Sequence, residues 1–251
     1  MSKEKKQTQK ARGNFLLELL AVILAVALIF TLTYPAQLWK QEEQNQQECR
    51  ENLQHIYYAE VTYLDSTLAY NDTLQKVIDF ILSDTTEKLL RRYTSLDSVL
   101  GSNIIDMFEA EDTLVTITVD SVFGEGPDSV LTFTQNIQVN ALVDSMLSFA
   151  NSIDLDTTEA FVIDSLRHWP LFSERIDSIA LATLTAIHTC PTVNRDYIIS
   201  VNNDTVPKMI DIYCPIDSTD QEALKEDFQK SFLGGLKIEN HGGLESGEKT
   251  W

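Results

Sequence analysis

The stretch RGNFLLELLAVILAVALIFTLTYP, residues 12–35, decides the architecture that we expect for this chain. From Leu19 to Trp39 the sequence continues for 21 residues without a formal charge, and most of these residues are apolar. At about 1.5 Å per residue, a helix of this length spans roughly 30 Å, the thickness of a bilayer core. One carboxylate, Glu18, stands at its start. Carboxylates in membrane helices usually have a partner or a function.

The charge distribution predicts how the helix is oriented. The formal net charge is −19, but residues 1–13 hold five Lys or Arg and one Glu, which leaves −23 on the remainder. The positive-inside rule then places the N-terminus in the cytoplasm and the acidic body outside it. Such a body does not bind nucleic acid, because binding to phosphates needs a basic face. A cleaved secretory signal is the rival interpretation, but its apolar region is usually only about 7–15 residues.

The residues after the apolar run predict that the helix continues. Residues 40–66 are rich in Gln and Glu, good helix formers, and contain no Gly or Pro. The residues that recur at helical spacing are Leu53, Ile56, Ala59 and Tyr63. We expect one long helix that spans the membrane over residues 14–39 and is amphipathic over residues 40–66. Pro35 should kink it mildly by removing one backbone hydrogen bond.

The acidic body, residues 67–234, mixes helical and strand patterns, so the expected fold class is α+β. Helical patterns cover residues 74–82, 85–101 with Gly101 as a stop, 141–150, 158–168 and 174–187. Alternating residues predict a β-hairpin over about 113–139 and a second one in which YIISV and MIDIY flank NNDTVPK. Residues 235–251 are polar and rich in Gly, and we expect a tail with at most one edge strand around Leu236–Ile238.

The N-terminal residues resemble those of type IV pilins and of type II secretion pseudopilins. The chain has a basic leader ending in Gly13, a Glu18 five residues later and Pro35 twenty-two residues after the glycine. The resemblance implies that a prepilin peptidase cuts between Gly13 and Asn14. It also implies N-methylation of the new terminus, although the family usually has Phe, or sometimes Met, where this chain has Asn14.

The resemblance also implies a role for Glu18. In a filament of staggered helices, the new ammonium group of Asn14 would pair with Glu18 of a neighbouring subunit or of its own chain. Each charge then removes the desolvation cost of the other, and the pair sets the register of the helices. The alternative is a Glu18 that reaches the interface or is simply protonated.

The three cysteines favour a disulfide. Cys190 and Cys214 each precede a proline, flank the second hairpin and lie in a compartment predicted to be oxidising. A Cys190–Cys214 bond would be worth roughly 3 kcal/mol in the chain-entropy model. A zinc site would need two further ligands, and His188 is the only histidine near these cysteines in the sequence. Cys49 is left over on a helix that we expect to be exposed.

One further group of acidic residues is a candidate for metal binding. Asp154, Asp156 and Glu159 could supply oxygen ligands to Ca²⁺, but a cap for the helix after Thr157 explains the same residues more simply. No HExxH, GxSxG or P-loop motif occurs, so we expect no enzyme activity, no resident cofactor and no other metal.

The resulting hypothesis is a pilin-like or pseudopilin subunit of a type II secretion or type IV pilus system. It would be a single-pass protein of the inner membrane with a periplasmic body. Its partners would be copies of itself or other pseudopilins, a prepilin peptidase and an inner-membrane assembly platform. The alternative is an uncleaved, membrane-anchored periplasmic adaptor or binding protein. An enzyme on a membrane tether is a third hypothesis.

Overall fold

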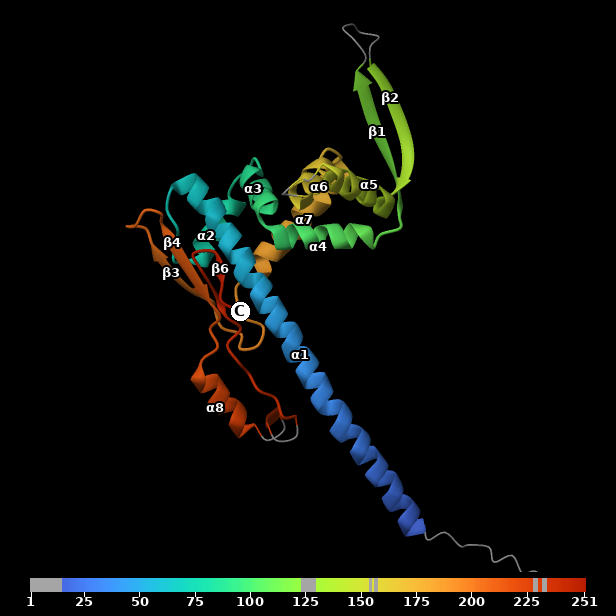
Figure 1. Ribbon diagram of the computed structural model, residues 1–251, viewed down its shortest axis with the longest axis vertical. Helices are drawn as coiled ribbons and strands as arrows, with labels where there is room; N and C mark the ends of the chain where they lie inside the picture. Colours follow the sequence, from blue (N-terminus) through green and yellow to red (C-terminus); the bar gives the residue numbers. More distant parts are fainter. Residues whose placement is uncertain (1–14, 123–129, 154, 156–157, 228–229, 232–233) are drawn as a thin grey trace, which may run out of the picture. The chain divides into compact units, whose positions relative to one another are not determined.

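The computed structural model describes residues 15–122, 130–153, 155, 158–227, 230–231 and 234–251 (Figure 1). The chain divides into two compact units. Unit 1 comprises residues 1–44 and 217–239, and unit 2 comprises residues 45–216 and 240–251. The described elements form an α+β protein with a long N-terminal helix and small antiparallel sheets, in agreement with the expected fold class.

Helix α1 (Phe15–Thr67) confirms the long helix. It is continuous over 53 residues and contains Pro35 without ending there. The hydroxyl groups of Thr31 and Thr33 each donate a hydrogen bond of 2.9 Å to a carbonyl oxygen one turn earlier. Their polarity is therefore satisfied within the helix itself.

In unit 2, α1 buries one face along its length. The fully buried residues of this face are Cys49, Leu53, Ile56, Ala59, Glu60 and Thr62. The predicted helical spacing is confirmed, and the buried face begins one turn earlier than the apolar residues alone indicate, at Cys49.

Shorter helices make up most of the remaining core of unit 2. They are α2 (Leu74–Leu82), α3 (Lys88–Leu96), α4 (Ser98–Glu109), α5 (Val139–Ser152), α6 (Thr158–Leu166) and α7 (Pro170–Ala186). Helices α4 to α7 pack together, as Figure 1 shows. The rings of Phe108 and Phe172 meet edge to face, with their centroids 5.5 Å apart, a favourable aromatic geometry.

The prediction of a single helix over residues 85–101 is wrong, because Asp97 divides this region into α3 and α4. The Asp97 side chain accepts a hydrogen bond from the backbone N–H of Leu100 and so caps the start of α4. Gly101 does not stop a helix but lies buried inside α4. A Cβ at this position would lie 3.3 Å from the Cβ of Glu159, so glycine permits the close packing of α4 on α6.

Both predicted hairpins are confirmed. Strands β1 (Leu114–Val122) and β2 (Val130–Gln138) pair antiparallel, as do β3 (Ile198–Asn202) and β4 (Met209–Tyr213). The second pair belongs to a four-stranded sheet of order β3-β4-β5-β6, which includes β5 (Gly243–Glu245) and β6 (Glu248–Lys249).

The polar tail expected over residues 235–251 is also wrong in its second half. Strand β5 pairs with β4, and Leu244 is 2% exposed. The pairing is close: a Cβ on Gly243 would lie 2.4 Å from Cδ1 of Tyr213 and 2.8 Å from the carbonyl oxygen of Ile212. The glycine is therefore required by packing. The edge strand expected at Leu236–Ile238 is absent, since these described residues have no strand structure.

Unit 1 contains a helix that the sequence patterns did not predict. Helix α8 (Ser218–Glu226) begins with a capping box, in which the side chains of Asp217 and Asp220 each accept a hydrogen bond from the other residue's backbone N–H. Two orphan donors at the helix start are thereby satisfied.

Candidate functional site

The part of α1 that belongs to unit 1 exposes apolar side chains around its whole circumference. Between residues 15 and 32, the large apolar side chains that the structure describes range from 46% exposed at Leu19 to 75% at Phe15. They include three consecutive residues, Val22, Ile23 and Leu24, which point in different directions. A helix that is apolar all round suits a bilayer or a bundle of other helices. In the described part of the chain, α1 is long and apolar enough to be a candidate membrane span.

Glu18 lies in the first turn of α1, within this exposed apolar part, and its side chain is exposed. Its side chain is therefore accessible to a partner. The two residues of the expected cleavage site, Gly13 and Asn14, lie outside the described residues. The ion pair between Glu18 and the Asn14 ammonium group stays a prediction.

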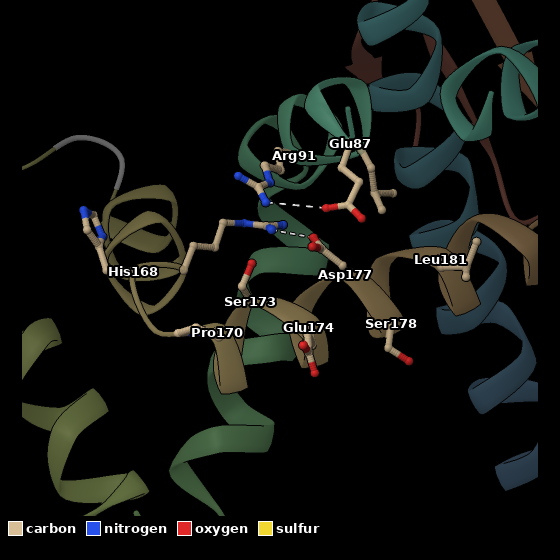
Figure 2. A pocket seen from close by; sticks show the side chains of 11 residues that line it. Glu87, Arg91, His168, Pro170, Ser173, Glu174, Asp177, Ser178 and Leu181 are labelled. Carbon is tan, nitrogen blue, oxygen red and sulfur yellow. Dashed lines mark hydrogen bonds and ion pairs between the residues drawn. The ribbon is translucent and has the colours of Figure 1, made fainter. Parts of the chain in front are cut away.

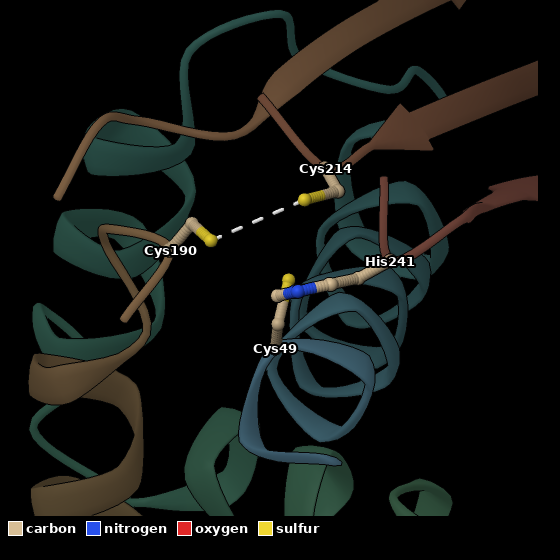
Figure 3. Close-up of side chains that lie close together, drawn as sticks. All are labelled: Cys49, Cys190, Cys214 and His241. Atoms are coloured by element: carbon tan, nitrogen blue, oxygen red, sulfur yellow. Dashed lines mark hydrogen bonds between the residues drawn. The ribbon is translucent and has the colours of Figure 1, made fainter. Parts of the chain in front are cut away.

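A second candidate site lies within unit 2 and joins four side chains that are far apart in the sequence (Figure 3). Cys49 comes from α1, Cys190 from the loop after α7, Cys214 from the residue after β4, and His241 from the segment before β5. We call these four residues the Cys/His cluster. One ligand atom from each lies within 4.8 Å of the others. All four residues are at most 2% exposed.

The cluster corrects two expectations. Cys49 is not on an exposed face of its helix but is fully buried. His188 is not among the clustered residues, whereas His241, in the expected tail, supplies the imidazole. Nearness in sequence was a poor guide, because the pairing of β5 with β4 brings His241 to Cys214 from 27 positions away.

The three cysteines are free thiols in the structure. The sulfur atoms of Cys190 and Cys214, the pair expected to form a disulfide, lie 4.0 Å apart. Figure 3 shows Cys49 pointing toward the same space. Proximity alone therefore does not select one cysteine pair, and the disulfide stays a prediction.

Backbone and side-chain hydrogen bonds fix the loops that carry the cluster. The backbone N–H of Cys214 donates to the carbonyl oxygen of Gly242 at 3.0 Å, which ties two clustered segments together. The side-chain amide of Asn240 donates to the carbonyl oxygens of Cys214 and Ile216, at 3.2 and 2.7 Å. The backbone N–H of Cys190 donates to the carbonyl oxygen of Arg195 at 2.9 Å.

Two arginines hold carbonyl groups next to or within the cluster. Arg50 Nε donates to the carbonyl oxygen of His241 at 3.1 Å, and Arg195 Nη2 donates to that of Pro215 at 2.6 Å. Both guanidinium groups bring positive charge to the surroundings of the cluster. They also restrain the backbone at His241 and just beyond Cys214.

Hydrogen bonds between the sulfurs separate the pKa values of the thiols. Interactions with Cys190, then Cys49 and His241, lower the pKa of Cys214 well below its ordinary value. Hydrogen bonds with Cys190 and Cys214, together with burial, raise the pKa of Cys49. A single anionic sulfur is thus stabilised by the donors around it, and a second one is disfavoured where no cation balances the charge.

The sequence patterns also missed two buried ionisable sites on α1. His55 Nδ1 lies 2.6 Å from Oδ2 of Asp97, and both side chains are buried. Glu60 is fully buried, and its Oε2 accepts the backbone N–H of Asn71 at 3.0 Å. Burial is the main cause that raises the pKa of Glu60 to about 8. Helical spacing was the available signal, since Glu60 follows Ile56 by one turn.

An open cavity of about 680 Å³ lies between α3, with its N-cap Glu87, and α7, with the two residues Arg167 and His168 before it (Figure 2). Its two arginines are engaged within the protein: Arg91 pairs with Glu87 at 3.5 Å, and Arg167 pairs with Asp177. Arg167 keeps two buried donors, Nε and Nη2, without a hydrogen-bond partner among the described residues. Three carboxylates line the cavity beside the two arginines, so its lining carries no excess of positive charge.

The weak calcium candidate is only partly visible. Asp154 and Asp156 lie outside the described residues. Glu159 lies in the first turn of α6, with its Cβ against the Gly101 position of α4. The alternative assignment of these residues to a helix cap also depends on residue 157, which is not described.

Comparison of the chain with protein-family models, with curated proteins and with solved structures found no match.

Proposed function

We propose that this chain is a pilin-like structural subunit, which is held in the inner membrane by the N-terminal part of α1 and polymerises through it. The observation that carries this proposal is that one continuous helix has two parts with different surroundings. Its apolar N-terminal part exposes side chains on every side, whereas its continuation buries one face in an α+β unit. The proposed system is of the type II secretion or type IV pilus kind, with the body in the periplasm.

The physical argument for polymerisation starts from the helix surface. A membrane anchor needs only an apolar helix and is better without a carboxylate, because a charged residue at the centre of a membrane helix costs about 2.5–3.5 kcal/mol. Glu18 is retained and exposed in the first turn of the described helix. An ammonium group created after Gly13 would give this carboxylate a partner, and pairing across subunits would set the stagger of neighbouring helices.

The bond after Gly13 separates this function from that of an uncleaved adaptor. The full-length chain should be produced in the membranes of cells with and without a prepilin peptidase, and the mass and N-terminus of the purified protein determined. We expect a chain that begins at Asn14 only where the peptidase is present. The matched control is Gly13→Leu, which should keep Met1 in both cells.

An intact N-terminus in cells that contain an active prepilin peptidase would refute the pilin-like function. The protein would then be a single-pass anchored adaptor. Cross-linking of the membrane fraction adds a second measurement, because a pilin-like subunit should give a ladder of oligomers through α1.

A further inference from the structure

We propose that Cys49, Cys190, Cys214 and His241 bind one Zn²⁺ ion as a closed tetrahedral site. This inference concerns the fold of unit 2 and does not depend on polymerisation. Three cysteine sulfurs and one imidazole form a complete ligand set for structural zinc.

The distances in the Cys/His cluster agree with this coordination. Zinc bonds of about 2.3 Å to sulfur and about 2.0 Å to nitrogen require ligand atoms roughly 3.5–3.8 Å apart in a tetrahedron. The sulfurs of Cys190 and Cys214 are 4.0 Å apart, and no two ligand atoms exceed 4.8 Å. A contraction of at most about 1.3 Å between any two ligand atoms therefore forms the site, which side-chain rotation can supply.

The surroundings of the cluster agree with a structural metal site. All four ligands are at most 2% exposed, so the fourth position is taken by protein and not left open to substrate. The backbone that carries the ligands is also held in place: the N–H of Cys214 donates to the carbonyl oxygen of Gly242 at 3.0 Å, and the N–H of Cys190 donates to that of Arg195 at 2.9 Å. Hydrogen bonds around a metal site keep its ligands oriented.

The charges also balance well. Three thiolates and one neutral imidazole with Zn²⁺ leave one net negative charge. Each cysteine that is protonated before binding releases one proton, and no oxidation state changes. Arg50 and Arg195 hold carbonyl groups next to or within the ligand segments. Both guanidinium groups are thus held at segments that carry ligands, where their positive charge favours an anionic site.

A metal explains more of the cluster than a disulfide does. A Cys190–Cys214 bond would use two of the side chains and leave a buried thiol at Cys49 beside a buried imidazole at His241. Zinc uses all four and links α1 to the sheet through β4 and β5. Since the ligands come from distant parts of the chain, the free energy of metal binding would stabilise their tertiary arrangement.

The test begins with the full-length chain purified in detergent from cell membranes without chelators. Metal content is measured by plasma mass spectrometry, and cysteine state by alkylation under denaturing conditions followed by peptide mass spectrometry. We expect about one zinc per chain and three free thiols. A disulfide between any two cysteines in protein from the cell envelope would overturn the proposal, as would a reduced chain that binds no zinc.

Co²⁺ provides a measurement that does not depend on a variant. The chain is stripped with chelator under reducing conditions and titrated with Co²⁺. We expect the intense visible absorption of tetrahedral Co²⁺ and thiolate-to-metal charge-transfer bands, both abolished by one equivalent of Zn²⁺. The weak absorption of octahedral Co²⁺ would exclude the site.

Variants identify the ligands. His241→Gln and Cys49→Ser should each lower zinc content at least about tenfold, because each leaves only three protein ligands. The matched control is His188→Gln, which should keep the wild-type content. Cys49→His preserves four ligands, so it should retain the metal with weaker sulfur charge-transfer bands even if Cys49→Ser does not fold. Loss of zinc in His188→Gln and its retention in His241→Gln would refute the assignment.

Discussion

Glu60 should make the stability of unit 2 depend on pH. Its carboxyl group is fully buried in α1, with one hydrogen bond from the backbone N–H of Asn71. Burial raises its pKa from an ordinary value of 4.5 to about 8, and the negative charge of Asp72 adds to the effect. The folded protein therefore favours the protonated carboxyl group more strongly than the unfolded chain does.

The sign and size of the effect follow from proton linkage. The stabilisation is fully present below the unfolded pKa of about 4.5 and is lost as pH rises through the folded value of about 8. Each pH unit in this interval corresponds to about 1.4 kcal/mol, so between pH 5 and pH 8 the folded state should lose roughly 3–4 kcal/mol.

The assay compares the wild type with Glu60→Gln in detergent, where unit 2 is unfolded by urea at a series of pH values. Gln cannot ionise, so the variant should lack the Glu60 contribution and be more stable than the wild type at pH 8. At pH 5 the two should be similar, or the variant slightly less stable.

Taking the difference between the two proteins removes the contributions of other titrating groups. Glu48→Gln, an exposed position on the same helix, should keep the wild-type profile. Parallel stability curves for wild type and Glu60→Gln from pH 5 to pH 8 would refute the reasoning.

Further expected outcomes test the assembly helix and two structural positions. Glu18→Leu should insert and be cleaved normally but form few cross-linked oligomers, because an unpaired buried ammonium costs about 3–5 kcal/mol; normal oligomers would make Glu18 a simple interfacial residue. Asp97→Ala should lower the free energy of unfolding by about 2–4 kcal/mol, because α4 loses its cap and His55 its buried partner. Asp97→Asn, which can keep both hydrogen bonds, should cost less, and equal losses would contradict this account. Gly243→Ala should cost about 1–3 kcal/mol, because the added Cβ would overlap Tyr213. Thermal unfolding would measure this loss, and a stability equal to wild type would show that β5 has room for a side chain.

Local patterns were sufficient for much of the fold. The continuous helix follows from an apolar run joined to good helix formers without glycine, and both hairpins follow from alternating residues around turn sequences. These features depend on neighbours within a few residues. The boundary between α3 and α4 was missed because it depends on Asp97, whose side chain caps α4. The same side chain contacts His55 on α1, which is distant in the sequence.

The long helix, its apolar N-terminal part and the position of Glu18 at its start could be read from the residues in order, because helical periodicity and hydrophobicity are properties of contiguous residues. The burial of Cys49 could also have been predicted, because Cys49 precedes the buried Leu53 by one helical turn and so lies on the same face of the helix. The proximity of Cys49 to His241 could not be read in this way, since it depends on the long-range pairing of β5 with β4. The glycines before and within β5 suggested a loose tail, whereas packing uses Gly243 for a close approach of two strands. Composition cannot tell a glycine in a flexible tail from a glycine that close packing requires, because the residues that pack against Gly243 lie elsewhere in the sequence.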